Sequence, residues 1–147
     1  MTKRPVMQSF QNGLAVLSQI ALADQPVSVS DLRQATGIAP STLSRLLSAL
    51  VEQGYIKRVQ PRKFALDYGA LLVGGQAILS SPLIQHGRRI ADDLCRTLNR
   101  PAYIGTVWQE RTFVLYHTWV HVQQDGYAFG RIGKRQLHDS SIGRIML

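Results

Sequence analysis

"GIAPSTLSRLLSALVEQGY", residues 37–55, places a turn directly before a leucine-rich segment. The apolar residues of that segment fall at helical spacing on one face: Leu43, Leu46, Leu47, Leu50 and Val51. The opposite face and its flanks are short and hydroxylated, with one arginine: Ser41, Thr42, Ser44, Arg45 and Ser48. Pro40 suits the first helical turn, because the N–H that proline lacks is not needed there.

Small hydroxyl side chains let a helix backbone approach base edges in the DNA major groove, and they bond to bases or phosphates. Arg45 adds a two-pronged donor that binds guanine or a phosphate. The short turn at 37–40 sets the preceding helix across this one, as in a helix-turn-helix. The alternative is a serine-rich amphipathic helix of an ordinary bundle, since Ser and Thr are only neutral helix formers.

Two further helices are predicted before this segment. Residues 7–23 carry apolar side chains at helical spacing, namely Phe10, Leu14, Leu17, Ile20 and Ala21. Residues 28–36 open with Ser28 and Asp31 in the order of a capping box, and Gly37 suits the left-handed position that ends a helix.

A basic hairpin is predicted after the leucine-rich helix. Residues 55–60 and 62–66 are β-prone and flank a short turn at Pro61. The hairpin carries four basic residues: Lys57, Arg58, Arg62 and Lys63. In this position it is expected to act as a wing that lies along the sugar-phosphate backbone. The alternative is that the hairpin is basic only because exposed strands need charge to stay soluble.

Composition agrees with a polyanionic partner. The 147-residue chain is 45% hydrophobic, which is enough for a core, and its 17 Lys and Arg against 9 Asp and Glu give a net charge of +8. Such an excess favours nucleic acid first and an anionic membrane surface second, and on charge alone a basic but otherwise ordinary protein is an equal alternative. A single cysteine excludes an internal disulfide framework and suits a reducing compartment. No signal peptide or membrane span is predicted, so we expect a soluble cytoplasmic protein with no membrane partner.

Residues 7–74 resemble the DNA-binding domain of IclR-type bacterial transcriptional regulators. The matching stretches are "SFQNGLAVL", "VSVSDLRQATGIAPSTLSRLLSALVEQGYIKR" and "KFALDYGALLVG". The resemblance implies an α+β protein with a winged helix-turn-helix over residues 1–68, a linker helix over 69–81 and a GAF-like effector-binding domain that begins at 82. It also implies homodimers, or dimers of dimers, on palindromic double-stranded DNA operators.

This chain departs from the family pattern at one position of the first helix. The family usually has an arginine where this chain has Asn12. The arginine's contact with the DNA backbone is therefore missing, or it is supplied by the N-terminal arm through Lys3 or Arg4.

Two helices and three strands are predicted after the hairpin. Residues 67–80 form an apolar helix in which Gly74–Gly75 serve packing or a hinge, because no phosphate-loop lysine follows them. Residues 82–98 form an amphipathic helix that places seven apolar residues on one face: Leu83, Ile84, Ile90, Ala91, Leu94, Cys95 and Leu98. Cys95 is interpreted as a core residue rather than a reactive thiol. Strands are expected at 102–108, 112–120 and 126–132.

The stretch "LHDSSIGRIML", residues 137–147, resembles the family motif that begins a helix beside the effector pocket. The matching effector-binding positions are Ser141 and Ile142, and a helix N-terminus there suits a small organic carboxylate. A plain helix cap is an equal alternative, and Ile142 is bulkier than the family's usual residue. Because the chain stops inside this apolar run, residues 82–147 are expected to be an incomplete effector domain.

The sequence gives no indication of an enzyme. No Ser/His/Asp set, paired-carboxylate motif or nucleotide loop is recognised, and no cofactor is expected. The histidines of "HTWVH", at 117 and 121, would lie roughly 13 Å apart along a strand, too far to share a metal. We therefore expect a sequence-specific, effector-controlled DNA-binding regulator. The alternative is a winged-helix module for protein–protein assembly.

Overall fold

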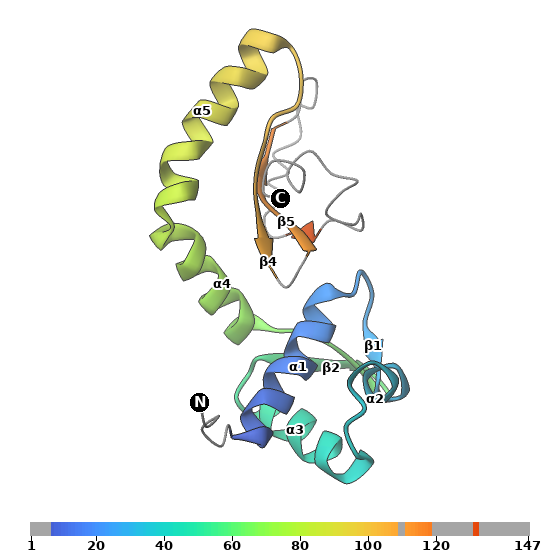
Figure 1. The fold of residues 1–147 in the computed structure, drawn as a ribbon. Helices are drawn as coiled ribbons and strands as arrows, with labels where there is room; N and C mark the ends of the chain where they lie inside the picture. The colour runs from blue at the N-terminus through green and yellow to red at the C-terminus, as the bar shows by residue number, and fades with distance from the viewer. Residues whose placement is uncertain (1–6, 109–110, 119–130, 133–147) are drawn as a thin grey trace, which may run out of the picture. The chain divides into compact units, whose positions relative to one another are not determined.

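The computed structural model describes residues 7–108, 111–118 and 131–132. The chain divides into two compact units, Met1–Gln76 and Ala77–Leu147. The first unit holds three complete helices, a small sheet and most of a fourth helix, and the second holds the end of that helix, a long helix and a second sheet (Figure 1). The predicted α+β class, with an N-terminal winged helix-turn-helix, is confirmed.

The first unit runs helix, strand, helix, helix, hairpin. Its elements are α1 (Gln8–Leu22), β1 (Val27–Ser28), α2 (Val29–Thr36), α3 (Pro40–Glu52), β2 (Ile56–Gln60) and β3 (Lys63–Leu66). The strands form an antiparallel sheet in the order β1-β3-β2. The two-residue strand β1 is not predicted by the sequence, because a segment this short gives no alternation pattern.

The ends of α2 form as their sequence predicts. The Asp31 amide donates to Ser28 Oγ at 3.1 Å, and the Ser28 amide donates to Asp31 Oδ2 at 3.3 Å, so the capping box is closed. Gly37 ends the helix at φ 68°, in the left-handed region that glycine enters without steric cost. These local bonds fix the length of α2 and the start of the turn that leads into α3.

One hydrophobic core joins all three helices to the hairpin. Its buried side chains are Val16, Ile20, Leu32, Ile38, Leu43, Leu47, Ile56 and Phe64. The helical spacing of α1 predicts burial that is only partly found, since Phe10 is 62% and Leu14 is 48% exposed. The core takes the neighbouring face of α1, where Val16 and Ile20 lie and where Gly13 approaches Leu46.

Helix α4 (Tyr68–Ser80) begins in tight contact with the end of α3. The Gly69 amide donates to the Gly54 carbonyl at 2.8 Å, and the Asp67 amide donates to the Tyr55 carbonyl at 2.9 Å. A Cβ at Gly69 would lie 2.7 Å from the Gly54 carbonyl oxygen, so only glycine fits this approach. None of the side chains of α4 is buried, although most are apolar.

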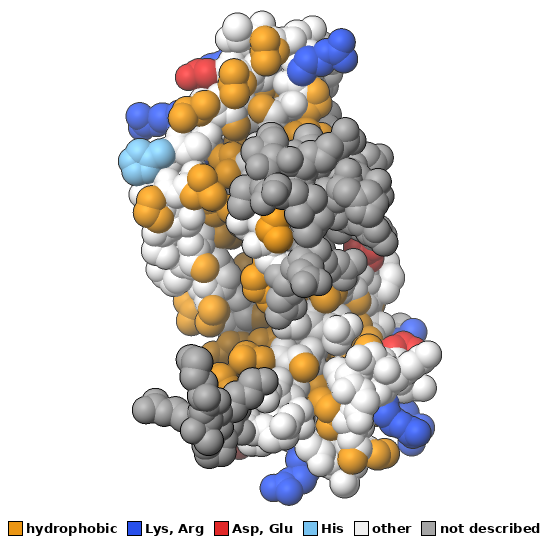
Figure 2. All heavy atoms as spheres, in the orientation of Figure 1, with side chains coloured by type: hydrophobic (Ala, Val, Ile, Leu, Met, Phe, Trp, Pro, Cys, Tyr) orange, Lys and Arg blue, Asp and Glu red, His pale blue; other side chains and the backbone are white. Residues whose placement is uncertain are grey.

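The second unit packs α5 (Pro82–Leu98) on an antiparallel sheet of β4 (Tyr103–Trp108), β5 (Arg111–His117) and β6 (Arg131–Ile132). Helix α5 buries Ile84, Ala91 and Cys95, which confirms Cys95 as a core residue. The other four apolar residues assigned to that face are exposed: Leu83, Ile90, Leu94 and Leu98. Hydrophobic side chains along α4 and α5 stand at the surface in Figure 2.

Tyr116 ties β5 to α5 through its hydroxyl. The Tyr116 hydroxyl donates to Asp92 Oδ1 at 2.7 Å, and Arg88 lies 5.8 Å from the ring centre. Burial, together with the Asp92 carboxylate, raises the pKa of Tyr116, and Arg88 opposes that shift. Because the folded pKa is raised, the stability that neutral Tyr116 contributes is present below about pH 10 and is lost as the pH rises through the folded pKa.

Two kinds of feature are absent from the described residues. None of their helices is both long and apolar enough to cross a bilayer. No three His, Cys, Asp or Glu side chains among them gather as metal ligands. His117 lies on β5, and His121 lies outside the described residues.

We predict that Gly69→Ala lowers the free energy of unfolding by about 1–3 kcal/mol, the usual cost of overpacking. Gly74→Ala is the matched control in the same helix, because a Cβ there meets no described atom within 4 Å. Replacing that helical glycine should raise stability by about 0.5–1 kcal/mol. Urea denaturation of the three proteins checks both signs, and equal effects at the two positions would contradict the close approach at Gly69.

Candidate nucleic-acid interface

Helix α3 presents a polar face to the surface because its leucines face the core. Leu43 is fully buried and Leu47 is 3% exposed. Four of the five residues predicted for the recognition helix are exposed, namely Ser41, Ser44, Arg45 and Ser48, and Thr42 is half-buried. At 100° per residue, Arg45 lies nearly opposite the Leu43–Leu47 stripe. The structure therefore brings these five residues to one side of a single helix.

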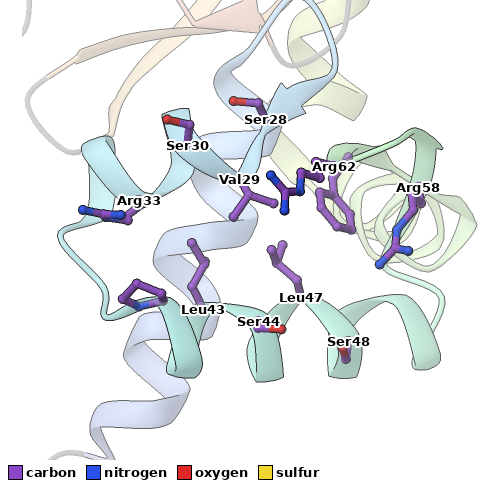
Figure 3. Close-up of a pocket in the computed structure, with 12 residues that line it drawn as sticks. Ser28, Val29, Ser30, Arg33, Leu43, Ser44, Leu47, Ser48, Arg58 and Arg62 are labelled. Atoms are coloured by element: carbon purple, nitrogen blue, oxygen red, sulfur yellow. The ribbon is translucent and has the colours of Figure 1, made fainter.

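A groove of about 690 Å³ runs between α3, the start of α2 and the hairpin (Figure 3). Ser44 and Ser48 line it from α3, and Leu43 and Leu47 form its apolar floor. Ser28 and Ser30 line it from the start of α2. Hydroxyl groups therefore line two sides of a concave surface.

Arginines from separate elements stand around this groove. Arg58 lines it from β2 and Arg62 from the turn between β2 and β3, whereas Arg33 lines it from α2 (Figure 3). The Arg58 guanidinium lies 5.5 Å from the centre of the Phe64 ring, which supports it over an apolar surface. Among the described residues that line the groove none is acidic, so the groove is positively charged.

Such a groove suits a phosphodiester backbone. Guanidinium groups bind phosphate through two parallel hydrogen bonds and keep their charge at any physiological pH. Serine hydroxyls donate to phosphate oxygens or accept from base amino groups.

The four basic residues of the hairpin do not share one face. Side chains alternate along a strand, and Arg58 pairs with the buried Phe64 while Lys57 pairs with Ala65 on the other face. Lys57 Nζ lies 3.6 Å from Asp67 Oδ1 and 5.7 Å from the centre of the Tyr68 ring. Lys63 precedes Phe64 and so belongs to the same face as Lys57. Only Arg58 and Arg62 of the four line the groove.

Other expected site residues lie outside the described part of the chain. These are Lys3 and Arg4 of the N-terminal arm and Ser141 and Ile142 of the effector site. Asn12, the departure noted in the first helix, lies on α1, where its Oδ1 accepts from the Gln8 side chain at 3.0 Å.

Arg33, Ser28 and Ser30 line the groove, although the sequence patterns do not mark them as site residues. The pattern around Ser28 predicts only a cap, which it is, and Arg33 resembles an ordinary surface charge. Their positions at the start and in the last turn of α2 could have identified them as candidate site residues. In a helix-turn-helix the helix before the recognition helix crosses the DNA backbone.

Residues 9–60 match the IclR helix-turn-helix domain. The transcriptional repressor IclR of Escherichia coli (strain K12) is 27% identical over 146 residues, which cover 96% of this chain and 52% of the repressor. This chain spans about half the length of the curated relatives it matches.

Two solved structures have a similar fold. An IclR family transcriptional regulator from Brucella abortus matches with a TM-score of 0.80 at 20% identity, over 97% of this chain and 54% of that chain. An IclR homologue from Microbacterium hydrocarbonoxydans, solved as a complex with 4-hydroxybenzoate, matches with a TM-score of 0.66 at 16% identity, over 92% of this chain and 56% of that chain. At these identities the similarity concerns the fold.

If the groove binds a phosphodiester backbone, the double variant Arg58→Gln/Arg62→Gln should weaken duplex DNA binding in a salt-dependent way. The slope of log K against log[salt] should flatten by roughly 0.9 for each phosphate that the variant no longer neutralises. A matched variant, Arg89→Gln/Arg100→Gln, removes the same charge from exposed sites of the second unit. Fluorescence anisotropy at several salt concentrations measures both slopes. An unchanged slope in the hairpin variant would mean that this side of the hairpin does not touch DNA.

Proposed function

We propose, from the match of residues 9–60 to the IclR helix-turn-helix domain, that this chain is a transcriptional regulator of that family and binds a specific duplex DNA operator through α3. The observation that carries the proposal is the exposed face of α3 that contains Ser41, Arg45 and Ser48, beside a groove with three arginines. The core places this face outward, and its short side chains leave the helix backbone accessible.

In the proposed complex α3 enters the major groove. Arg45, at the middle of the outward face, binds the edge of a base, and guanine offers the two acceptors that its guanidinium fits. Ser41, Thr42, Ser44 and Ser48 contact neighbouring bases or phosphates.

The hairpin and α2 hold the DNA backbone on either side of α3. Arg58 and Arg62 contact phosphates from the hairpin, and Arg33 contacts phosphates from α2. Lys63 and the N-terminal arm residues Lys3 and Arg4 add further backbone contacts, through the exposed end of the hairpin and through the arm. These contacts supply affinity without sequence preference.

The protein acts as a homodimer or a dimer of dimers in this proposal. Tyr68, Leu71 and Leu72 share one face of α4, and they are 78%, 67% and 66% exposed. A helix with an exposed apolar face needs a partner surface, and a second copy of α4 supplies one of the same kind. Two copies would present two α3 helices to a palindromic operator.

The second half of the chain is proposed to begin a domain that responds to a small organic effector in the cytoplasm. Support comes from the homologue solved with 4-hydroxybenzoate, a carboxylate. Ser141 and Ile142 are the proposed effector contacts of this chain. Isothermal titration of the chain with small aromatic and aliphatic carboxylates tests this part of the proposal separately from DNA binding.

Arg45→Ala should weaken operator binding more than binding to random duplex. A base contact of this kind is worth about 1–3 kcal/mol, which corresponds to about a 5- to 150-fold loss in operator affinity. The control Arg89→Ala removes one charge from an exposed site on α5 and should leave the ratio of the two affinities unchanged. Equal losses for operator and random duplex would make Arg45 a phosphate contact. Absence of any salt-dependent binding by the unsubstituted chain would favour the protein–protein module instead.

Leu72→Glu should shift the protein from dimer to monomer in analytical ultracentrifugation. The substitution places a charge on the proposed α4 contact, where it would be buried without a partner. Val73→Glu is the matched control, because Val73 is 56% exposed and lies about 100° further around the same helix. The proposed contact would be refuted if both variants kept the oligomeric state of the unsubstituted chain.

A further inference from the structure

Lys57 occupies an unusual position among the basic residues of the hairpin. Its ammonium lies 3.6 Å from the Asp67 carboxylate and 5.7 Å from the centre of the Tyr68 ring. Asp67 immediately precedes α4, and Tyr68 is its first residue. The side chain of Lys57 therefore extends from β2 to the start of α4, along the face of the hairpin that is turned away from the groove.

Backbone contacts join the same two segments. Asp67 and Gly69 donate their amides to the carbonyls of Tyr55 and Gly54, just before β2 begins. The Asp67 carbonyl accepts from the amides of Ala70 and Leu71, which makes Asp67 the residue that caps the first turn of α4. A carboxylate at this position is favoured by the partial positive charge of a helix N-terminus.

We propose that Lys57 is a positioning residue that holds the hairpin and the first turn of α4 as one rigid body, and that it does not contact DNA. Its charge is matched by Asp67, whose side chain is only 24% exposed, and its alternation on β2 directs it away from Arg58 and the groove. The DNA contacts of the hairpin then come from Arg58 and Arg62, while Lys57 fixes the angle at which the hairpin leaves α4.

The first turn of α4 would move together with the hairpin. This turn is held by two backbone bonds, the ion pair and the ring contact. A rotation of the first turn is therefore passed to the hairpin.

Hydrogen exchange of the free protein tests the joint without DNA. Lys57→Met keeps the apolar stem and removes the charge, and it should speed exchange of the Asp67 and Gly69 amides roughly two- to fivefold, the range that a partly exposed ion pair supports. Asp67→Asn removes the other charge but keeps a good helix cap, and it should give the same increase. Lys63→Met is the control, because Lys63 pairs with no carboxylate among the described residues. Exchange at these two amides that matches the control would overturn the positioning role.

Salt dependence of DNA binding tests the second half of the inference, which rests on the proposed function. Lys57→Met should leave the slope of log K against log[salt] unchanged, whereas Arg62→Gln should flatten it by roughly 0.9. A flattening of that size in Lys57→Met would show that Lys57 contacts a phosphate and would overturn the assignment. If the unsubstituted chain binds no DNA, the proposed function fails, and the exchange result still decides the role of Lys57 in the joint.

Discussion

The packing of the α3 leucines against the core of the first unit is the contact on which the interface depends. Leu43 and Leu47 are buried with Val16, Ile20 and Leu32, and this fixes the rotation of α3 about its axis. Turning the helix by one residue would bring Ser44 inward and expose Leu43. Full burial of one leucine is worth roughly 1.5–3 kcal/mol, so that rotation is strongly disfavoured. The outward position of Arg45 is thus a consequence of leucine burial on the opposite side.

The same core fixes the faces of the hairpin. Ile56 and Phe64 are buried beside the α3 leucines, and strand alternation then assigns Arg58 to the groove side and Lys57 to the other. A slip of one residue in the register would exchange the two faces and expose Phe64. Four basic residues that look equivalent in the sequence are thereby separated, because the register is set by two apolar side chains that carry no charge.

Sequence patterns predict what depends on local interactions. The leucine spacing of α3, the Ser28–Asp31 capping box and Gly37 each act within a few residues, and each is found as expected. Features that depend on distant partners are not predicted. Arg33 lines the groove only because the hairpin folds against α2 and α3, and β1 exists only because β3 lies beside it. Helical spacing also overestimates burial on α1 and α5, because it groups apolar residues without showing which of them the fold covers.

The joint between α3, the hairpin and α4 is a small contact, and it connects the DNA-binding face to the exposed apolar face of α4. Helix α4 contributes no buried side chain, and its first turn is joined to the residues before β2 by backbone bonds at Asp67 and Gly69. Hydrogen bonds are short and directional, and the first turn of α4 approaches Gly54 so closely that only glycine fits at position 69. A second copy packed on the exposed face of α4 would therefore set the spacing and orientation of the two α3 helices. In the proposed dimer, the half-site spacing that the protein can bind depends on this joint as well as on the residues that touch DNA.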